Sequence, residues 1–436
     1  MTTMQPTTFV RERFTWLAYL LLGYYAYYLN APGVAMPLLR ADLNLSYTTG
    51  GLHMSALALG MVGGGLIAAR FVRRFGRQAV VWGGGAGMSL GALLVAAGRH
   101  PALTIPALGF MGLAGTTLLT TLQSSLADSH GRFRALALTE ANVVASVTTV
   151  LAPVLVGGFA RAGLSWRTAF ALPVLVWMLL FWLSRSEPVP QPAGSQPSVI
   201  ADPPLPRLFW YYWVVLLLVV SVEWSIISWG ADFLVEAGAL ARADASLVMS
   251  AFFVAMLIGR ALGTTLARRF ELISLLLAAM GLALGGFLLF WLSSPGALRI
   301  AGLFVAGLGV ANLFPFLLSI GMGVAAANSD LGSARLTIGT GAAIFLAPLT
   351  LGWVADQTGI GTAYQAVAVL LVVAITIVFP AGDFLIHRGG ECGPGTSPVP
   401  LRLHSRTSVL KLTGTLITRI GCGLSRRTSR DVKPVE

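Results

Sequence analysis

Apolar runs of about twenty residues, the length that crosses a bilayer as a helix, recur along the whole chain. Of its 436 residues, 56% are hydrophobic and only 11% are charged. A water-soluble domain must wet its exterior, so this composition is typical of a protein whose helices lie in lipid. The runs predict an all-α membrane protein with twelve transmembrane helices, at residues 14–37, 48–69, 78–98, 102–126, 135–160, 168–184, 208–235, 246–267, 272–292, 299–325, 334–354 and 362–386.

The arginines between the runs predict the orientation of the chain. The first run starts at Phe14 and is not followed by a cleavage-type site, so we expect it to remain as a span. An even number of spans places both termini on one side. The short loops on that side, including the one with Arg73, Arg74 and Arg77, carry more arginines than the others. We therefore expect a multi-pass protein of the cell (inner or plasma) membrane with both termini cytoplasmic.

A proline-rich segment at 185–207 divides the spans six and six. It cannot form one helix, because proline lacks the backbone N–H and breaks helices. We predict two six-helix bundles joined by a cytoplasmic linker, and a basic tail that is disordered and has no role in transport. The segments are 1–13, the bundle 14–184, the linker 185–207, the bundle 208–386 and the tail 387–436.

The two bundles repeat one another in sequence. Arg73-Arg74-Phe75 recurs as Arg268-Arg269-Phe270, an offset of 195 residues. The pattern Leu-Ala-Pro-x-x-x-Gly begins at Leu151 and again at Leu346, at the same offset. Two matches at one offset, each at an equivalent place in its bundle, indicate a duplication and two pseudo-symmetric bundles. At this offset, Glu223 corresponds to Tyr28.

Polar residues gather in every third span, starting with the first, whereas spans 3, 6, 9 and 12 are almost purely apolar. Spans 1, 4, 7 and 10 are therefore predicted to line a central aqueous path. The alternative is that hydroxyl groups bond to carbonyls of their own helix. The candidates for a substrate or proton pathway are Tyr24, Tyr28 and Asn30 in span 1, Thr117 and Gln123 in span 4, Glu223 and Ser228 in span 7, and Asn312 in span 10.

Glu223 is the candidate with the clearest physical meaning. It lies ten residues beyond Trp213, or about 15 Å along a helix, near the middle of a hydrocarbon core about 30 Å thick. A carboxylate at that depth costs about 2.5–3.5 kcal/mol, so it should face protein or water. Three roles are open: a proton-titrating coupling site, which we favour, a fixed counter-charge to a cationic substrate, or a structural acid. His53 and Asp232 lie near the outer ends of their spans. Either could gate access, but we expect both to be solvated.

Two motifs resemble those of the major facilitator superfamily. The loop Arg73-Arg74-Phe75-Gly76-Arg77-Gln78 resembles the signature G-x-x-x-D-R-x-G-R-R, and Ser165-Trp166-Arg167-Thr168-Ala169-Phe170 is similar to W-R-x-x-F. The resemblance covers residues 14–386 and implies the major facilitator fold, with secondary transport by alternating access. It also implies a gating role for Arg73, Arg74 and Arg77. Because Arg73 stands where the family has an aspartate that latches the cytoplasmic ends, that latch is lost or moved.

The family fold also suggests a pair between spans 5 and 8, which meet across the two halves. Glu140 and Arg260 lie at similar depths in these spans, and we predict that they pair and help to close the cytoplasmic side. The alternative is that Arg260 reaches to the interface and Glu140 meets Arg134. In span 7, Glu223-Trp224-Ser225-Ile226-Ile227-Ser228-Trp229 is similar to the E-x-x-x-x-x-W pattern of fucose-permease-like sugar/proton symporters. Spans 1 and 4, unlike those of such symporters, hold no carboxylate.

The predicted function is secondary active transport of a small organic solute, coupled to protons. The alternatives are a drug or metabolite efflux antiporter and a transporter-like membrane sensor without net flux. The sequence shows no nucleophile, metal or phosphate-binding constellation, so we expect no enzymatic activity and no cofactor. The basic residues punctuate the apolar runs rather than forming one face, which argues against nucleic acid. The expected partners are a small-molecule substrate, protons and the lipid bilayer, with the protein as a monomer.

Overall fold

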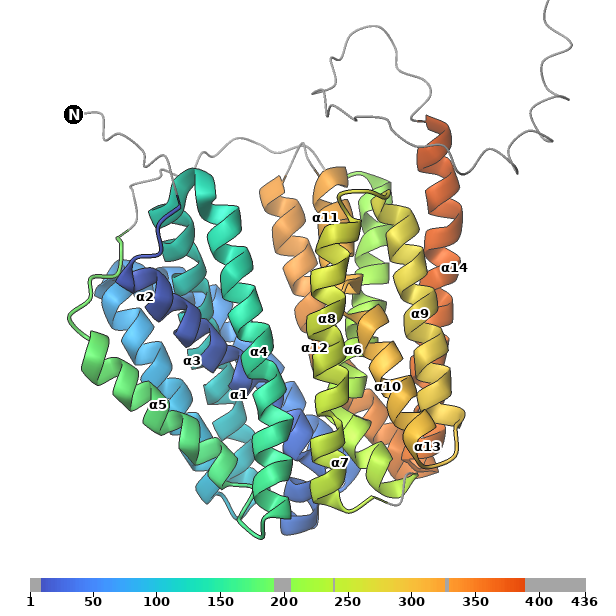
Figure 1. Ribbon diagram of the computed structural model, residues 1–436, viewed down its shortest axis with the longest axis horizontal. Coiled ribbons are helices and arrows are strands. Elements are labelled where there is room, and N and C mark those ends of the chain that lie inside the picture. Colours follow the sequence, from blue (N-terminus) through green and yellow to red (C-terminus); the bar gives the residue numbers. More distant parts are fainter. Residues whose placement is uncertain (1–8, 192–204, 238–239, 326–328, 389–436) are drawn as a thin grey trace, which may run out of the picture. The chain divides into compact units, whose positions relative to one another are not determined.

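The computed structural model describes residues 9–191, 205–237, 240–325 and 329–388, and within these ranges all regular structure is helical (Figure 1). The described residues up to Leu385 form one compact unit. The predictions made for the tail beyond residue 388, for residues 1–8 and for the middle of the linker lie outside the described residues.

The chain begins with six helices. They are α1 (Arg13–Leu43), α2 (Tyr47–Ala97), α3 (Pro101–His130), the short 3-10 helix η1 (Gly131–Phe133), α4 (Arg134–Arg161) and α5 (Thr168–Ser184). After the linker come α6 (Arg207–Glu236), α7 (Arg242–Val248), α8 (Ser250–Leu266), α9 (Leu272–Leu292), α10 (Ala297–Val310), α11 (Leu313–Val324), α12 (Ser329–Thr358), α13 (Ile360–Ala363) and α14 (Gln365–Arg388).

Eight helical segments of the described chain are long and apolar enough to cross a membrane. Two of them, Tyr47–Ala97 and Pro101–Arg161, have 51 and 61 residues, whereas one crossing needs only about 20. The first bends at Gly76, whose φ of +78° and ψ of 159° are not helical. This bend falls between the predicted spans 48–69 and 78–98, at a residue that tolerates positive φ. The prediction of a polytopic helical membrane protein is confirmed. The eight segments include neither α1 nor the 17-residue α5.

Three of the predicted spans are broken in the structure, and one of them, at 362–386, is split between α13 and α14 at Tyr364. The span predicted at 246–267 consists of α7 and α8, separated at Met249. The span predicted at 299–325 consists of α10 and α11, separated at Ala311 and Asn312. Pro315 follows this break and has no N–H to donate back to Ala311, which weakens the helix there.

Close backbone contact joins α2 to α3. A Cβ atom at Gly60 would lie 1.8 Å from the carbonyl oxygen of Gly109, and one at Gly112 would lie 2.2 Å from that of Leu57. Such contact is possible only for residues without a side chain, which is how small residues bring membrane helices together.

Replacing Gly60 with Ala should therefore force α2 and α3 apart. We expect a loss of about 1–3 kcal/mol, the usual cost of overpacking, seen as a lower melting temperature of the detergent-solubilised protein. Gly83→Ala is the matched control, because a Cβ at Gly83 meets nothing within 4 Å. Equal melting temperatures for the two variants would contradict this packing argument.

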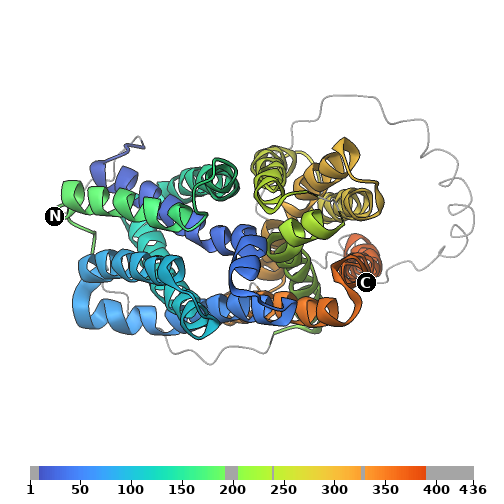
Figure 2. The same ribbon diagram turned by 90° about the horizontal axis from the view of Figure 1, so that it is seen from below.

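The helices before and after the linker form two neighbouring groups (Figure 2). We call residues 9–191 the N-terminal half and residues 205–385 the C-terminal half. At one end of the molecule, called here the Arg40 end, α1, α6 and α12 finish and α2 begins. The opposite end, called the Gly76 end, holds the bend in α2 and the residues that flank the linker.

Candidate functional site

A cavity of about 190 Å³ lies between the two halves. The N-terminal half contributes residues of α1, α3 and α4 to its wall, and the C-terminal half contributes residues of α6 and α8. Its polar lining consists of Tyr25, Asn30, Gln123, Asn142, Ser146, Thr149, Glu223 and Arg260. Side chains such as Trp224 and Phe253 complete the wall. A cavity shared by both halves can hold a ligand whose contacts change when the halves move.

Glu223 and Arg260 bring opposite charges to this cavity. Glu223 is half-buried on α6, and Arg260 is exposed on α8. Their charges interact electrostatically, yet no ion pair joins them within the part of the chain that the structure describes. Arg260 donates from Nη1 to Ser146 Oγ at 3.1 Å. Glu223 lines the cavity from α6, as expected of a carboxylate that must face protein or water.

Two further predicted pathway residues line the cavity. Asn30 does so while donating from Nδ2 to the carbonyl oxygen of Ala26 at 2.9 Å, and Gln123 is exposed to the cavity. Tyr25, outside the predicted set, lies on the same face of α1 as Asn30. That face repeats at Leu22, Tyr25, Ala26, Leu29 and Asn30, the helical spacing of three and four residues.

Tyr28 and Tyr24 do not line the cavity. Tyr28 is fully buried and donates from its hydroxyl to the carbonyl oxygen of Phe170 at 2.6 Å. The Tyr24 hydroxyl lies 2.6 Å from Ser89 Oγ. Both tyrosines therefore point into the N-terminal half, because they occupy a different face of α1 from the cavity stripe. The offset of 195 residues pairs Tyr28 with Glu223 in sequence, but it does not predict which face of the helix Tyr28 occupies.

Thr117, Ser228 and Asn312 also lie outside the cavity wall. Thr117 Oγ1 donates to the carbonyl oxygen of Ala114 in its own helix at 2.7 Å, the alternative weighed for hydroxyls in span 4. Asn312 donates from Nδ2 to the carbonyl oxygen of Gly259 at 2.6 Å and so ties the break between α10 and α11 to α8. Ser228 is fully buried.

The cavity also has polar residues on α4, which is not among the helices predicted to line the path. Asn142, Ser146 and Thr149 follow one another at spacings of four and three residues. This is the spacing of one helix face, and it would have identified span 5 as a lining helix.

Glu140 and Arg260 are not paired in this structure. Glu140 instead accepts hydrogen bonds from Arg11 Nη2 at 2.6 Å and from the Tyr19 hydroxyl at 3.1 Å. Arg11 lies just before α1, and its hydrogen bond to Glu140 raises the pKa of its guanidinium above the ordinary value. Arg134, the alternative partner considered for Glu140, does not bond to it either; Arg11 and Tyr19 do.

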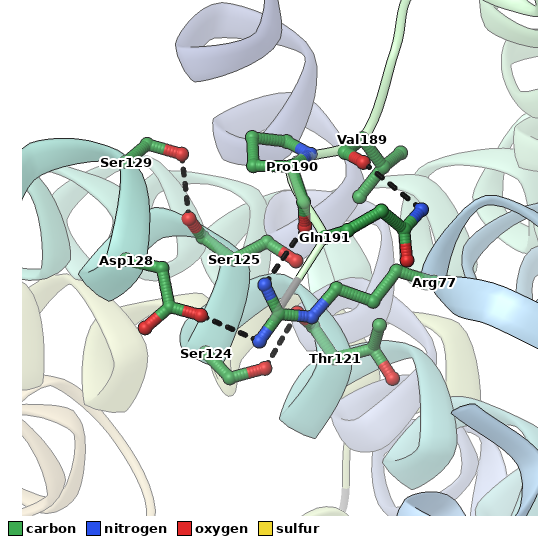
Figure 3. Close-up of polar contacts among 9 residues, drawn as sticks. All are labelled: Arg77, Thr121, Ser124, Ser125, Asp128, Ser129, Val189, Pro190 and Gln191. Atoms are coloured by element: carbon green, nitrogen blue, oxygen red, sulfur yellow. Dashed lines mark hydrogen bonds and ion pairs between the residues drawn. The ribbon is translucent and has the colours of Figure 1, made fainter. Parts of the chain in front are cut away.

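The basic loop at the Gly76 end is anchored within the N-terminal half (Figure 3). Arg77 is only 5% exposed and donates to Asp128 Oδ2 at 2.6 Å and to the carbonyl oxygen of Pro190 at 2.7 Å. It thereby joins α2 to the end of α3 and to the start of the linker. Arg74 is exposed, and Arg73 lines a separate cavity of about 360 Å³ between α2 and α3.

Replacing Arg77 with Gln should lower the thermal stability of the protein by about 1–3 kcal/mol, because it removes hydrogen bonds of a charged, nearly buried side chain. The melting temperature measures this effect. Arg74→Gln, at an exposed position of the same loop, is the control. If both variants melt alike, Arg77 does not hold the linker in place.

The halves are joined at the Arg40 end. Arg40 forms a short ion pair with Asp232, and its guanidinium lies 3.4 Å from the centre of the Tyr47 ring. Asp356 accepts hydrogen bonds from the backbone N–H groups of Tyr47 at 2.7 Å and Thr48 at 2.8 Å. The Arg40–Asp232 ion pair and the hydrogen bonds of Asp356 cross from one half to the other, so the halves meet at this end.

The expectation that Asp232 and His53 are solvated is wrong. The Asp232 side chain is 4% exposed. His53 is fully buried, with its ring nitrogens 2.7 Å from the carbonyl oxygen of Thr49 and 2.8 Å from Thr104 Oγ1. Contacts from other helices cover both residues, and such contacts cannot be read from one span.

The repeated Leu-Ala-Pro-x-x-x-Gly pattern has an equivalent place in both halves. A Cβ at Gly157 would lie 2.6 Å from the backbone nitrogen of Leu247, and one at Gly352 would lie 2.6 Å from the carbonyl oxygen of Tyr47. Each glycine thus allows its helix to touch the opposite half near the Arg40 end.

These features define a polytopic helical protein with a polar cavity between two halves that meet at one end. Residues 15–330 match the Major Facilitator Superfamily. The chain belongs to that superfamily and is a multi-pass membrane transporter, as the resemblance of its motifs implied.

Known relatives and solved structures agree with this membership. The chain is 27% identical over 357 residues to the multidrug resistance protein MdtL of Escherichia coli O81 (strain ED1a), covering 78% of this chain and 88% of the relative. Its fold is similar to an inward-facing, occupied structure of a bacterial homologue of the human lysosomal transporter Spinster, with a TM-score of 0.68, 16% identity and coverage of 87% and 98%. Its fold is also similar to that of the nucleoside transporter NupG, with a TM-score of 0.67 and 12% identity, covering 86% of this chain and 99% of NupG.

Proposed function

We propose that this chain is a secondary active transporter that moves a small organic solute across the cell membrane by alternating access. The observation that carries the proposal is the cavity, which takes residues from both halves while the halves are joined at the Arg40 end. Rocking of the halves about a site near the midplane would expose it to each side in turn. The positive-inside pattern makes the Gly76 end cytoplasmic.

The proposal includes twelve spans in two bundles, 14–184 and 208–386. The bend at Gly76 makes α2 two spans, and η1 separates two more in α3 and α4. Spans of two pieces arise where α7 precedes α8, α10 precedes α11, and α13 precedes α14. Together with α1, α5, α6, α9 and α12 these make twelve.

Glu223 is the proposed proton site. It supplies the one carboxylate among the residues that line the cavity. Ionisable residues inside membrane proteins mark ion and proton paths because an idle charge there is costly. Protonation of Glu223 from one side and its release to the other would couple the solute to a proton gradient.

Counterflow in proteoliposomes tests the transport proposal. Vesicles loaded with unlabelled solute should accumulate the labelled solute without an imposed gradient. A screen of sugars, organic acids and amphiphilic cations that yields no counterflow at normal reconstitution would favour the membrane sensor instead.

A drug or metabolite efflux antiporter is the second candidate, because the similar relative is named a multidrug resistance protein. The movement of protons distinguishes the two mechanisms. Symport acidifies the lumen as the solute enters, whereas antiport makes it alkaline.

A further inference from the structure

Resting on the proposed proton coupling, we propose that the solute is a small organic monoanion. Its carboxylate, or an anionic group of equal charge, binds Arg260. A proton on Glu223 balances the charge that the anion brings into the cavity.

Arg260 has unused capacity to bind an anion. A guanidinium has five N–H donors in a planar fork that matches a carboxylate. In the described part of the chain, Arg260 uses one of them, toward Ser146 Oγ. The side chain is exposed and lines the cavity. A carboxylate that accepts two parallel hydrogen bonds would satisfy the fork in the manner that makes such pairs strong.

The charges around the cavity favour an anion that travels with a proton. Arg260 from α8 is the charged group whose field acts on Glu223, and Tyr25 from α1 is the other titratable residue in the wall. The wall residues of α3 and α4 are uncharged: α3 contributes the amide of Gln123, and α4 contributes the amide of Asn142 and the hydroxyls of Ser146 and Thr149. The empty cavity is neutral when Glu223 is ionised, and it is neutral again when a monoanion and a proton are both bound.

Other solutes do not keep this balance together with proton coupling. A monocation beside ionised Glu223 and Arg260 leaves one unbalanced positive charge in the cavity, which is unfavourable because it repels Arg260. A neutral or zwitterionic solute keeps the cavity neutral only while Glu223 stays ionised, so it brings no charge for the proton to compensate.

The size and walls of the cavity describe the rest of the solute. Its volume of about 190 Å³ is below the roughly 300–1,000 Å³ of drug-sized sites. Trp224, Ile227, Phe253 and Met256 form apolar wall, and Gln123 and Asn142 offer amides. A small carboxylate with an apolar body fits this lining.

Matched probes that differ only in charge test the proposal. The purified full-length protein is titrated by calorimetry with isovalerate, isoamylamine and isovaleramide, and with benzoate, benzylamine and benzamide, at pH 5.5 and 7.5. We expect the anions to bind at least about tenfold more tightly than the matched amines and amides, and more tightly at pH 5.5. Equal or tighter binding of an amine or amide, or no binding by any probe, would overturn the proposal that the solute is a monoanion.

Substitutions separate the role of each charge. Arg260→Gln should weaken anion binding by roughly 10- to 100-fold, and Glu223→Gln should keep it while removing its pH dependence. The double variant should remain weak. If Arg260 served only as a counter-charge to Glu223, the double variant would instead regain wild-type affinity. Arg99→Gln and Glu271→Gln, at exposed positions outside the cavity, are the matched controls.

Failure of this inference is distinguishable from failure of the proposed function. Proton-coupled counterflow of a cation or a sugar would overturn the anion and leave the transporter intact. Counterflow of no solute would overturn the transporter itself.

Discussion

Replacing Glu223 with Gln is expected to abolish solute uptake driven by a pH gradient while sparing solute exchange. Glutamine keeps the shape of the protonated acid but cannot release a proton, so the variant would remain in the proton-loaded form. A saturating solute can still cross with the rocking halves, because Arg260 and the amides of the wall are unchanged. In proteoliposomes, pH-driven uptake should fall to the level of protein-free vesicles, while counterflow at saturating solute persists.

The control for this experiment is Glu271→Gln, an exposed carboxylate immediately before α9. It should transport like the wild type in both assays. If Glu223→Gln keeps the pH dependence of uptake, Glu223 is a structural acid and the proton binds elsewhere. If it loses counterflow as well at normal folding and expression, Glu223 contacts the solute directly.

The fold could be predicted because its signals are local. The length of an apolar run is enough to predict a span. Gly76 lies between two such runs and, as a glycine, can adopt the positive φ that the bend in α2 requires. Glu223 could be placed for a similar reason: a charge in an apolar run has few tolerable positions, and facing a cavity is one of them.

The partners of the remaining polar residues depend on contacts between distant parts of the chain. Composition and the repeat offset predict Tyr24 and Tyr28 on the path, yet the helical period turns both side chains away from it. Arg11 reaches Glu140 across 129 residues of sequence, and nothing within span 5 indicates this partner. The position of Asp232 near a helix end predicts a solvated acid, but Arg40 from another helix covers it.

Removing the charge of Arg40 is expected to shift the protein toward a state open at the Arg40 end. Asp232 would then be a buried carboxylate without its partner, which costs about 3–5 kcal/mol, and opening would return it to water. Ser55 reports the opening, because it is 2% exposed and donates to the carbonyl oxygen of Phe345 across the halves at 2.6 Å. With Ser55→Cys on a background lacking the chain's two cysteines, Arg40→Gln should accelerate maleimide labelling more than about tenfold.

The double variant Arg40→Gln with Asp232→Asn decides whether the pair itself holds the halves together. It leaves no unpaired charge, so labelling should return toward the slow rate of the parent. Arg99→Gln, exposed in the turn between α2 and α3, should not change the rate. Fast labelling of the double variant would mean that the ion pair itself holds the halves together, beyond the cost of an unpaired carboxylate. Slow labelling of Arg40→Gln alone would show that the hydrogen bonds of Asp356 suffice to keep this end closed.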